Sequence, residues 1–184
     1  MSEQLEMLEV VDGLDNMIGL ETRKKIHKDG LLHREIHIFF ITPKGEIIFQ
    51  HRAKDKDTYP DKLDATVAGH VEPNMSYEET AIKETKEETG LDINSKDLIV
   101  LEKMNLREVD EATGLINNTV RVQYAYLYKG LVEDLIVEEG KAIGFEPWNM
   151  DTLFTLSNKD KNRFKPIVIS NRFLLLFKKA KDLI

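Results

Sequence analysis

The sequence predicts an α+β fold in which helices cover a mixed β-sheet. Several short segments are rich in β-branched and aromatic residues and are separated by turn signals, which is typical of strands. A central segment carries the start and stop signals of a helix, and the end of the chain has apolar residues at helical spacing. The 184 residues are enough for a single domain, residues 1–184, with a core of its own.

Two hairpins are predicted in the first third of the chain. The first covers about residues 5–25, where "EMLEVVD" and "NMIGLETR" flank "GLD". In the second, "HIFFIT" and "EIIFQHR" flank "PKG", a proline–glycine turn signal. The segment "KLDATVAGH" predicts a further strand, directly before the central helix.

The central helix is predicted from about Tyr77 to Thr89. Ser76 and Glu79 have the spacing of a capping box, in which the serine hydroxyl caps a helical amide and the glutamate returns to the serine amide. Gly90 is a typical C-terminal stop, because glycine adopts the left-handed backbone conformation without strain. These signals fix which side chains share a face of the helix.

The second half of the chain predicts three strands and a final helix. The strands are expected in "LIVLEKM", "TVRVQYAYLYKG" and "KAIGFEPW". An amphipathic helix is expected over about residues 164–182, beginning near Phe164 or Pro166. Its apolar face would cover the chain's own sheet or a second subunit, so a homodimer is one of two expected arrangements.

Composition excludes several classes of function. The formal net charge of −7 argues against binding to a nucleic acid polymer, whereas a small phosphorylated substrate remains compatible if a metal supplies positive charge. The absence of cysteine excludes disulfides, thiolate zinc sites and thiol nucleophiles. "MSEQLEMLEVVDG" does not have the pattern of a secretory signal, and no apolar run approaches the roughly 20 residues that cross a bilayer. A cytoplasmic protein without a membrane partner is expected.

Three glutamates of the central helix could share one metal ion. Glu84, Glu87 and Glu88 stand at positions i, i+3 and i+4, which places them on one face. Three carboxylates side by side repel one another, and a divalent cation offsets this repulsion. Magnesium prefers such oxygen ligands and suits the hydrolysis of a phosphoanhydride. The alternative is an acidic helix face that is simply solvated.

The segment from Ala68 to Leu91 resembles a Nudix box, whose pattern is G-x5-E-x7-R-E-U-x-E-E-x-G-U with U an aliphatic residue. The matching residues are Gly69, Glu84, Glu87, Glu88, Gly90 and Leu91. The departing residues are Met75 at the first glutamate, Lys83 at the arginine and Thr85 at the aliphatic position. In the family, the first glutamate and the arginine support the loop and helix, often through mutual contact.

The resemblance implies a Nudix-type α/β/α sandwich with a mixed sheet and a Mg²⁺ cofactor, for which Mn²⁺ can substitute. By analogy the metal ligands would be Glu84, Glu87 and Glu88 together with the Gly69 carbonyl. The catalytic base of such enzymes is either a box glutamate, here Glu87 or Glu88, or a carboxylate on a later loop. Glu138 and Glu139 lie in such a loop, and Glu139 is the expected base of the second kind.

The region from about Leu8 to Leu153 is similar to the isopentenyl-diphosphate-isomerase-like branch of the superfamily. The similarity is carried by "HR", "QHR", "TYPDKLD", "AGHVE" and "GFEPWNMDTL". The isomerase needs a cysteine beside the loop glycine, where this chain has Ala68, and paired strand glutamates, where it has Asn117 and Thr119. Isomerase activity is therefore not expected.

Four further residues are candidates for binding the substrate. His33 and His70 match metal-ligand histidines of the isomerase, but the strand glutamates that complete that site are absent, so substrate-facing or structural roles are favoured. Arg34 and Arg52 are candidates for gripping a phosphate, since the guanidinium fork fits that group.

The resulting functional prediction is a Mg²⁺-dependent hydrolase that cleaves a diphosphate linkage in a nucleoside diphosphate derivative or a related compound. The alternative is a non-catalytic metal-binding, ligand-binding or regulatory protein on the same scaffold, which the three box departures favour. The sequence does not indicate which base, sugar or other moiety the substrate carries.

Overall fold

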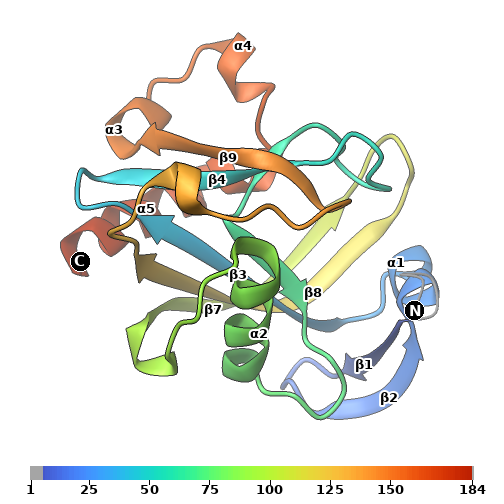
Figure 1. Ribbon diagram of the computed structural model, residues 1–184. Coiled ribbons are helices and arrows are strands. Elements are labelled where there is room, and N and C mark those ends of the chain that lie inside the picture. The colour runs from blue at the N-terminus through green and yellow to red at the C-terminus, as the bar shows by residue number, and fades with distance from the viewer. Residues whose placement is uncertain (1–5, 184) are drawn as a thin grey trace.

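In the computed structural model, which describes residues 6–183, a nine-stranded mixed sheet organises the described chain (Figure 1). The strands are β1 Met7–Val11, β2 Met17–Thr22, β3 His33–Ile41, β4 Glu46–Arg52, β5 Leu63–Asp64, β6 Val67–His70, β7 Leu98–Val109, β8 Ile116–Leu127 and β9 Ala142–Asn149. The helices are α1 Arg23–Asp29, α2 Tyr77–Thr89, α3 Met150–Leu153, α4 Asn158–Lys161 and α5 Asn171–Leu183, with 3-10 turns η2 Ser95–Asp97, η3 Val132–Asp134 and η4 Pro166–Ile169.

Strand β3 is the centre of this sheet. It pairs in parallel with β8 along its whole length, and β8 forms a long antiparallel hairpin with β7. The other edge of β3 pairs in turn with β1, β6 and β4, while β9 extends the sheet beyond β4. In Figure 1 the β1–β2 hairpin and α1 gather at one end of the molecule, and α3, α4 and β9 lie at the other. The predicted mixed sheet is therefore confirmed.

The two faces of the sheet bury separate cores, because successive side chains of a strand point to opposite faces. Ile36, Ile38 and Phe40 belong to the core that also contains Ala81 of α2. Phe39 belongs to the other core, under α5, where its ring lies 4.7 Å from that of Phe177, centroid to centroid. Helices thus cover both faces, as an α/β/α sandwich requires.

The C-terminal helix begins later than predicted. Pro166–Ile169 forms a 3-10 turn, and Ser170 is extended (φ −66°, ψ 155°), so α5 starts at Asn171 rather than near 164. Residue Lys165, before the proline, is also extended, which is the backbone conformation that a following proline favours. The apolar face of α5 packs on the chain's own sheet, so it does not need a second subunit to be buried.

The N-terminal hairpin is followed by a helix that was not predicted. Strands β1 and β2 pair as expected, although residue 5 lies outside the described residues. Helix α1 then occupies 23–29; Thr22 caps its start by accepting a hydrogen bond from the Lys25 amide, and Gly30 ends it at φ 68°. Because α1 is short, its sequence carries little helical periodicity to detect.

The predicted strand "KLDATVAGH" is divided into β5 and β6 at Thr66. The Thr66 hydroxyl donates a hydrogen bond to the Ile48 carbonyl of β4 and accepts one from the Phe40 amide of β3. It therefore replaces backbone pairing at the point where the chain passes from β4 to β3. This crossing leads β6, and with it Gly69 and His70, along the middle of β3.

Candidate active site

Helix α2 is fixed by the predicted capping box. The Glu79 carboxylate accepts a hydrogen bond from the Ser76 amide (2.8 Å), and the Ser76 hydroxyl accepts one from the Glu79 amide (3.1 Å). Gly90 closes the helix in the left-handed conformation (φ 75°). The observed span, Tyr77–Thr89, is the predicted one. Because both ends of the helix are fixed, the direction in which each of its glutamates points is fixed as well.

Glu84 and Glu88 point from α2 toward the strand that carries Gly69. Their exposed fractions are 7% and 2%. A Cβ atom at residue 69 would lie only 2.6 Å from the Cδ atom of Glu84, so the helix carboxylate approaches the strand at a distance that only glycine allows. The carboxylates of Glu84 and Glu88, one helical turn apart, thus lie next to the backbone of β6.

The environment of Glu88 favours a nearby cation. Its Oε2 accepts a hydrogen bond from Gln50 Nε2 at 2.9 Å and a longer one from the Ala68 amide at 3.4 Å. Burial nevertheless raises the pKa of Glu88 to about 8, and burial also raises the pKa of Glu84. A carboxylate in such a place gains strongly from a counter-ion, because few water molecules can solvate its charge.

Glu87 does not join this pair in the structure. Its side chain is 46% exposed and lies 3.6 Å from Lys83 Nζ, and it is not among the residues that line the cavity described below. In an α-helix, residues 84 and 88 lie on nearly the same line, whereas 87 is displaced to one side. The predicted three-glutamate face is therefore a pair of buried carboxylates with a third at its solvent edge.

Met75 and Lys83 depart from the box pattern in the loop and in the helix, and a third residue, Glu72, restores the contact between these two elements. Lys83, in the arginine position, forms an ion pair with Glu72 at 2.5 Å. Glu72 lies in the same loop as Met75, so it supplies the carboxylate that Met75 does not. Loop and helix remain connected, although a lysine replaces the guanidinium fork.

Thr85, the third departure, is fully buried, and its hydroxyl has a hydrogen-bond partner. Its Oγ1 donates a hydrogen bond to the Ala81 carbonyl, four residues earlier, at 2.7 Å. A polar side chain in an aliphatic position costs little when its own helix accepts the hydrogen bond.

Lys141, from the loop before β9, reaches both buried carboxylates. Its Nζ lies 3.3 Å from Glu84 Oε2, 3.5 Å from Glu88 Oε1 and 3.1 Å from Glu138 Oε2. Glu139, the predicted base on this loop, is exposed and does not line the cavity. Its neighbour Glu138 does not line the cavity either, but its carboxylate contacts Lys141 Nζ and is thereby the late-loop carboxylate connected to the site.

These carboxylates open into a polar cavity of about 210 Å³ between α2, β3, β6 and the segment before α5. Its lining includes five cationic side chains: Arg23, Arg52, Lys56, Lys141 and Lys165. Carboxylates line it as well, so the cavity offers ligands for a metal ion and positive groups for an anion. The sequence reasoning did not single out Lys141 or Lys165, which come from segments far from the box.

Of the two predicted phosphate-binding arginines, only Arg52 lines the cavity. It donates hydrogen bonds to the Thr58 and Tyr59 carbonyls and lies 3.4 Å from Asp64. Arg34 points to the opposite side of β3, where it binds the carboxylates of Glu9 (2.5 Å) and Asp15 (2.7 Å). The structure therefore does not bring Arg34 to the cavity, because the alternation of side chains along a strand sends residue 34 away from the face of His33.

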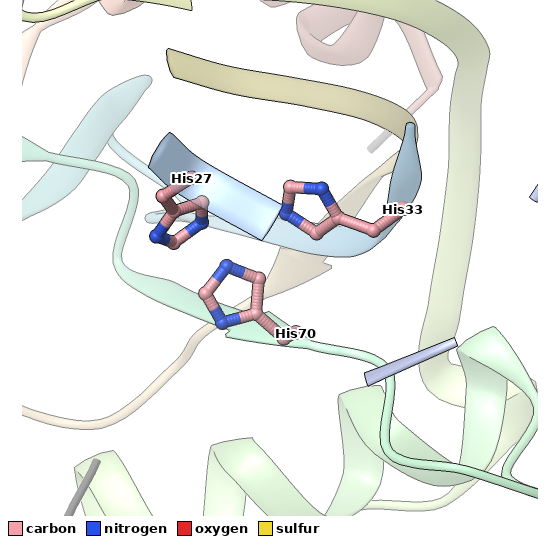
Figure 2. A group of neighbouring side chains, drawn as sticks. All are labelled: His27, His33 and His70. Atoms are coloured by element: carbon pink, nitrogen blue, oxygen red, sulfur yellow. The ribbon is translucent and has the colours of Figure 1, made fainter. Parts of the chain in front are cut away.

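His33 and His70 meet a third histidine, His27 of α1 (Figure 2). The three rings point toward one another, and one nitrogen from each lies within 4.8 Å of the others. His33 Nδ1 lies 3.0 Å from the Leu31 carbonyl, which can only accept, so this nitrogen carries the proton and Nε2 is left with a lone pair. His27 was missed because it belongs to the unpredicted helix.

The three imidazoles are suited to a transition metal. Burial lowers the pKa of His27 to about 4, and it also lowers the pKa of His33 and His70, so all three rings are neutral near pH 7. Nε2 of His27 and Nε2 of His33 are buried without a hydrogen-bond partner. Three neutral imidazoles whose nitrogens lie this close together resemble the ligand set of Zn²⁺ sites. Their grouping favours a metal-binding role over the separate substrate contacts predicted for His33 and His70.

We expect His27→Ala to weaken binding of Co²⁺, used as a spectroscopic stand-in for zinc, by at least about a hundredfold, because one of three nitrogen ligands is lost. Visible absorption during Co²⁺ titration gives the affinity. His51→Asn is the control, since His51 pairs with Asp61 and Glu146 outside the group. Equal Co²⁺ affinity in the His27 variant and the wild type would contradict a metal site here.

The floor of the cavity is a buried network of ion pairs. Arg121 is fully buried and binds Glu35 and Glu108, with Nε 2.6 Å from Glu35 Oε2 and Nη2 3.0 Å from Glu108 Oε2. Lys165 Nζ continues the network, 3.2 Å from Glu108 and 3.6 Å from Asp64. Each charge has at least one partner of opposite sign, which is the condition for burying it at acceptable cost.

Replacement of Arg121 by methionine is expected to lower the free energy of unfolding by about 3–5 kcal/mol, because Glu35 and Glu108 would lose a buried partner. Chemical denaturation measures this loss. Arg107→Met, on the exposed face of the neighbouring strand, is the control and should change stability by less than about 0.5 kcal/mol. If Arg121→Met lowered the free energy of unfolding no more than Arg107→Met does, the ion-pair network would not stabilise the protein.

Residues 31–163 match the family model of the NUDIX domain. The chain belongs to the Nudix family. This match confirms the predicted family. Over 97% of this Nudix chain and 87% of the relative, it is 29% identical to an uncharacterised Nudix hydrolase of Clostridium acetobutylicum. It is 27% identical to the isopentenyl-diphosphate Delta-isomerase of Paenarthrobacter aurescens, over 69% of this chain and 68% of the isomerase.

Solved structures agree with the Nudix fold. DR0079 from Deinococcus radiodurans superposes with a TM-score of 0.69 at 19% identity, over 94% of this chain and 98% of that one. Some curated relatives match over a smaller share, such as a Nudix hydrolase of Yersinia pestis, 36% identical over 47% of this chain and 48% of its own length.

This Nudix protein is an enzyme of the diphosphate-hydrolase type. None of the helices among residues 6–183 has the length and apolar character to span a membrane.

Proposed function

We propose that this protein hydrolyses a diphosphate linkage in a nucleoside diphosphate derivative or a related small molecule, with Mg²⁺ as cofactor. The observation that carries the proposal is the pair of buried carboxylates, Glu84 and Glu88, facing Gly69 in a cavity that also holds cationic side chains. Two carboxylates and a backbone carbonyl are oxygen ligands of the kind that Mg²⁺ prefers.

The proposed role of each residue follows from its position. Glu84, Glu88 and the Gly69 carbonyl would hold the metal, which would neutralise the diphosphate and favour attack by water. Gln50 keeps the Glu88 carboxylate oriented through its 2.9 Å hydrogen bond. Arg52 and Lys165 lie on the cavity wall, where they can bind phosphate oxygens. Glu138 replaces Glu139 as the proposed late-loop base, and Glu87 is assigned no ligand role.

The size and polarity of the cavity support a small substrate with several charged groups. The Nudix domain of Shewanella oneidensis NrtR was solved in complex with ADP ribose, which is a nucleoside diphosphate linked to a sugar. That domain is 13% identical to this chain, so the likeness concerns the fold, and the substrate class is our proposal.

A panel of substrates tests the proposal. Nucleoside diphosphate sugars, dinucleoside polyphosphates, nucleoside triphosphates and terpenoid diphosphates would each be incubated with Mg²⁺ or with Mn²⁺. Products would be separated by anion-exchange chromatography. We expect turnover of at least one nucleoside diphosphate derivative, dependent on the metal and abolished by chelation. Absence of turnover across the panel, with Mg²⁺ bound, would contradict the proposal and favour a non-catalytic role.

A further inference from the structure

Lys141 occupies the position at which a cation would meet the two buried carboxylates. Its ammonium contacts Glu84 Oε2 at 3.3 Å and Glu88 Oε1 at 3.5 Å, and each of these residues belongs to the proposed ligand set. The side chain of Lys141 is 30% exposed, so it reaches this place from the solvent side of the site. Where both carboxylates are ionised, this single ammonium neutralises part of the charge that Mg²⁺ would neutralise.

The backbone around Lys141 holds the loop against the end of α2 and the edge of β4. The Ile136 amide donates a hydrogen bond to the Thr89 carbonyl, and the Lys141 carbonyl accepts one from the Ala53 amide at 3.0 Å. Immediately after Lys141, β9 begins and pairs with β4. The loop is therefore tied at both ends, and the long side chain of Lys141 can change partners without any movement of the sheet.

Glu138 supplies a second observation that points to a change of partners. Its Oε2 atom is buried without a hydrogen-bond partner, although Lys141 Nζ lies 3.1 Å away as an ion-pair contact. The ammonium therefore stands among three carboxylates without good hydrogen-bond geometry to the third. When a divalent cation takes the oxygens of Glu84 and Glu88, it repels the ammonium and removes two of its attractive contacts.

We propose that Lys141 is an internal counter-ion of the metal-free site, which Mg²⁺ displaces and which then binds a phosphate group of the substrate. This inference rests on the proposed function, because it requires the carboxylate pair to bind the metal. Displacement moves the positive charge of Lys141 from the carboxylates to the cavity, where the diphosphate arrives. It also frees Glu138 to accept a proton from the attacking water.

Two affinities with opposite expected changes test this inference. In Lys141→Met, which keeps the unbranched chain without the ammonium, Mg²⁺ should bind about tenfold more tightly, since no positive charge competes for the carboxylates. Methylenediphosphonate, a diphosphate analogue whose P–C–P bridge resists hydrolysis, should bind about tenfold more weakly at saturating Mg²⁺. Isothermal titration calorimetry measures both values without turnover.

The controls separate charge from packing. Lys141→Arg keeps the positive charge and should restore both affinities toward the wild type, whereas Lys44→Met, in the exposed β3–β4 turn, should change neither. Lys141→Gln serves as a second uncharged variant if the methionine variant does not fold. Mg²⁺ affinity that is unchanged or weaker in the uncharged variant would overturn the inference.

The outcomes for the two proposals are distinguishable. If the wild type turns over substrate but the uncharged Lys141 variant binds Mg²⁺ as the wild type does, the inference about Lys141 fails and the hydrolase stands. If Mg²⁺ binds more tightly to the variant but no substrate is hydrolysed, the counter-ion role stands and the hydrolase proposal fails. If neither protein binds Mg²⁺, both are overturned.

Discussion

Replacing Glu88 by glutamine is expected to lower turnover by about a thousandfold, because a buried ligand loses the charge that holds the metal against the diphosphate. Gln50 can still donate a hydrogen bond to the new amide oxygen, so the side chain should keep its place. Steady-state kinetics on the substrate found in the panel measures the effect. Glu78→Gln, on the exposed first turn of the same helix, is the matched control and should retain full activity.

Stability distinguishes loss of the metal ligand from loss of the fold. In the folded protein burial raises the pKa of Glu88 from 4.5 to about 8, so the folded state binds this proton more tightly than the unfolded state does. The contribution of Glu88 to stability is therefore present below pH 4.5 and is lost as the pH rises toward 8. Without metal, Glu88→Gln should lack this decline and be at least as stable as the wild type at pH 8. Activity equal to the wild type, or collapse of the variant at pH 8, would contradict the assigned role.

Gly69→Ala is expected to reduce Mg²⁺ affinity and kcat/KM by about a hundredfold. The new Cβ would lie 2.6 Å from both Cγ and Cδ of Glu84 and 2.9 Å from its Oε2, so the carboxylate must move away from the site. Displacement of a ligand or a reacting group by about 1 Å commonly costs such a factor. Calorimetric titration with Mg²⁺ and initial-rate kinetics measure the two losses.

Gly144→Ala is the control for this substitution. Gly144 lies in β9, and an added Cβ there would meet no atom within 4 Å. Its metal affinity and activity should match the wild type. If Gly69→Ala behaved like Gly144→Ala, the close approach of Glu84 to the β6 backbone would have no part in binding the metal.

The elements that the sequence predicted well are those with local signals. The limits of α2 follow from Ser76, Glu79 and Gly90, each of which acts on a backbone group a few residues away. Strands β3 and β4 were found from their composition and the turn between them. The start of α5 was misplaced because the apolar spacing continues through Ile167, while the backbone bends at Ser170. The spacing of apolar side chains along the sequence does not reveal such a break in the backbone.

The acidic part of the candidate site was predictable from local spacing, and Arg52, His33 and His70 were found through the family resemblance. Glu84, Glu88 and Gly69 lie within one strand–loop–helix unit, so spacing could bring them together. His27, Lys141 and Lys165 enter through tertiary packing of distant segments, for which the sequence offers no local signal. The orientation of Arg34 depended on the face to which β3 directs each residue, and the hydrophobic pattern of a strand buried on both faces does not reveal this.

The parallel pairing of β3 with β8 also determines how the chain reaches its native state. The pair His33↔Thr119 joins strands that are far apart in the sequence, and the pairing of β3 with β8 cannot form before the long intervening segment closes. Entropy opposes closure until many contacts form at once, so folding is expected on the slow side, in milliseconds to seconds. The strand–loop–helix unit that bears Gly69, Glu84 and Glu88 is local and can form early. Lys141 and Lys165 come from segments nearer the C-terminus, so they can join the cavity only when those segments pack against this unit.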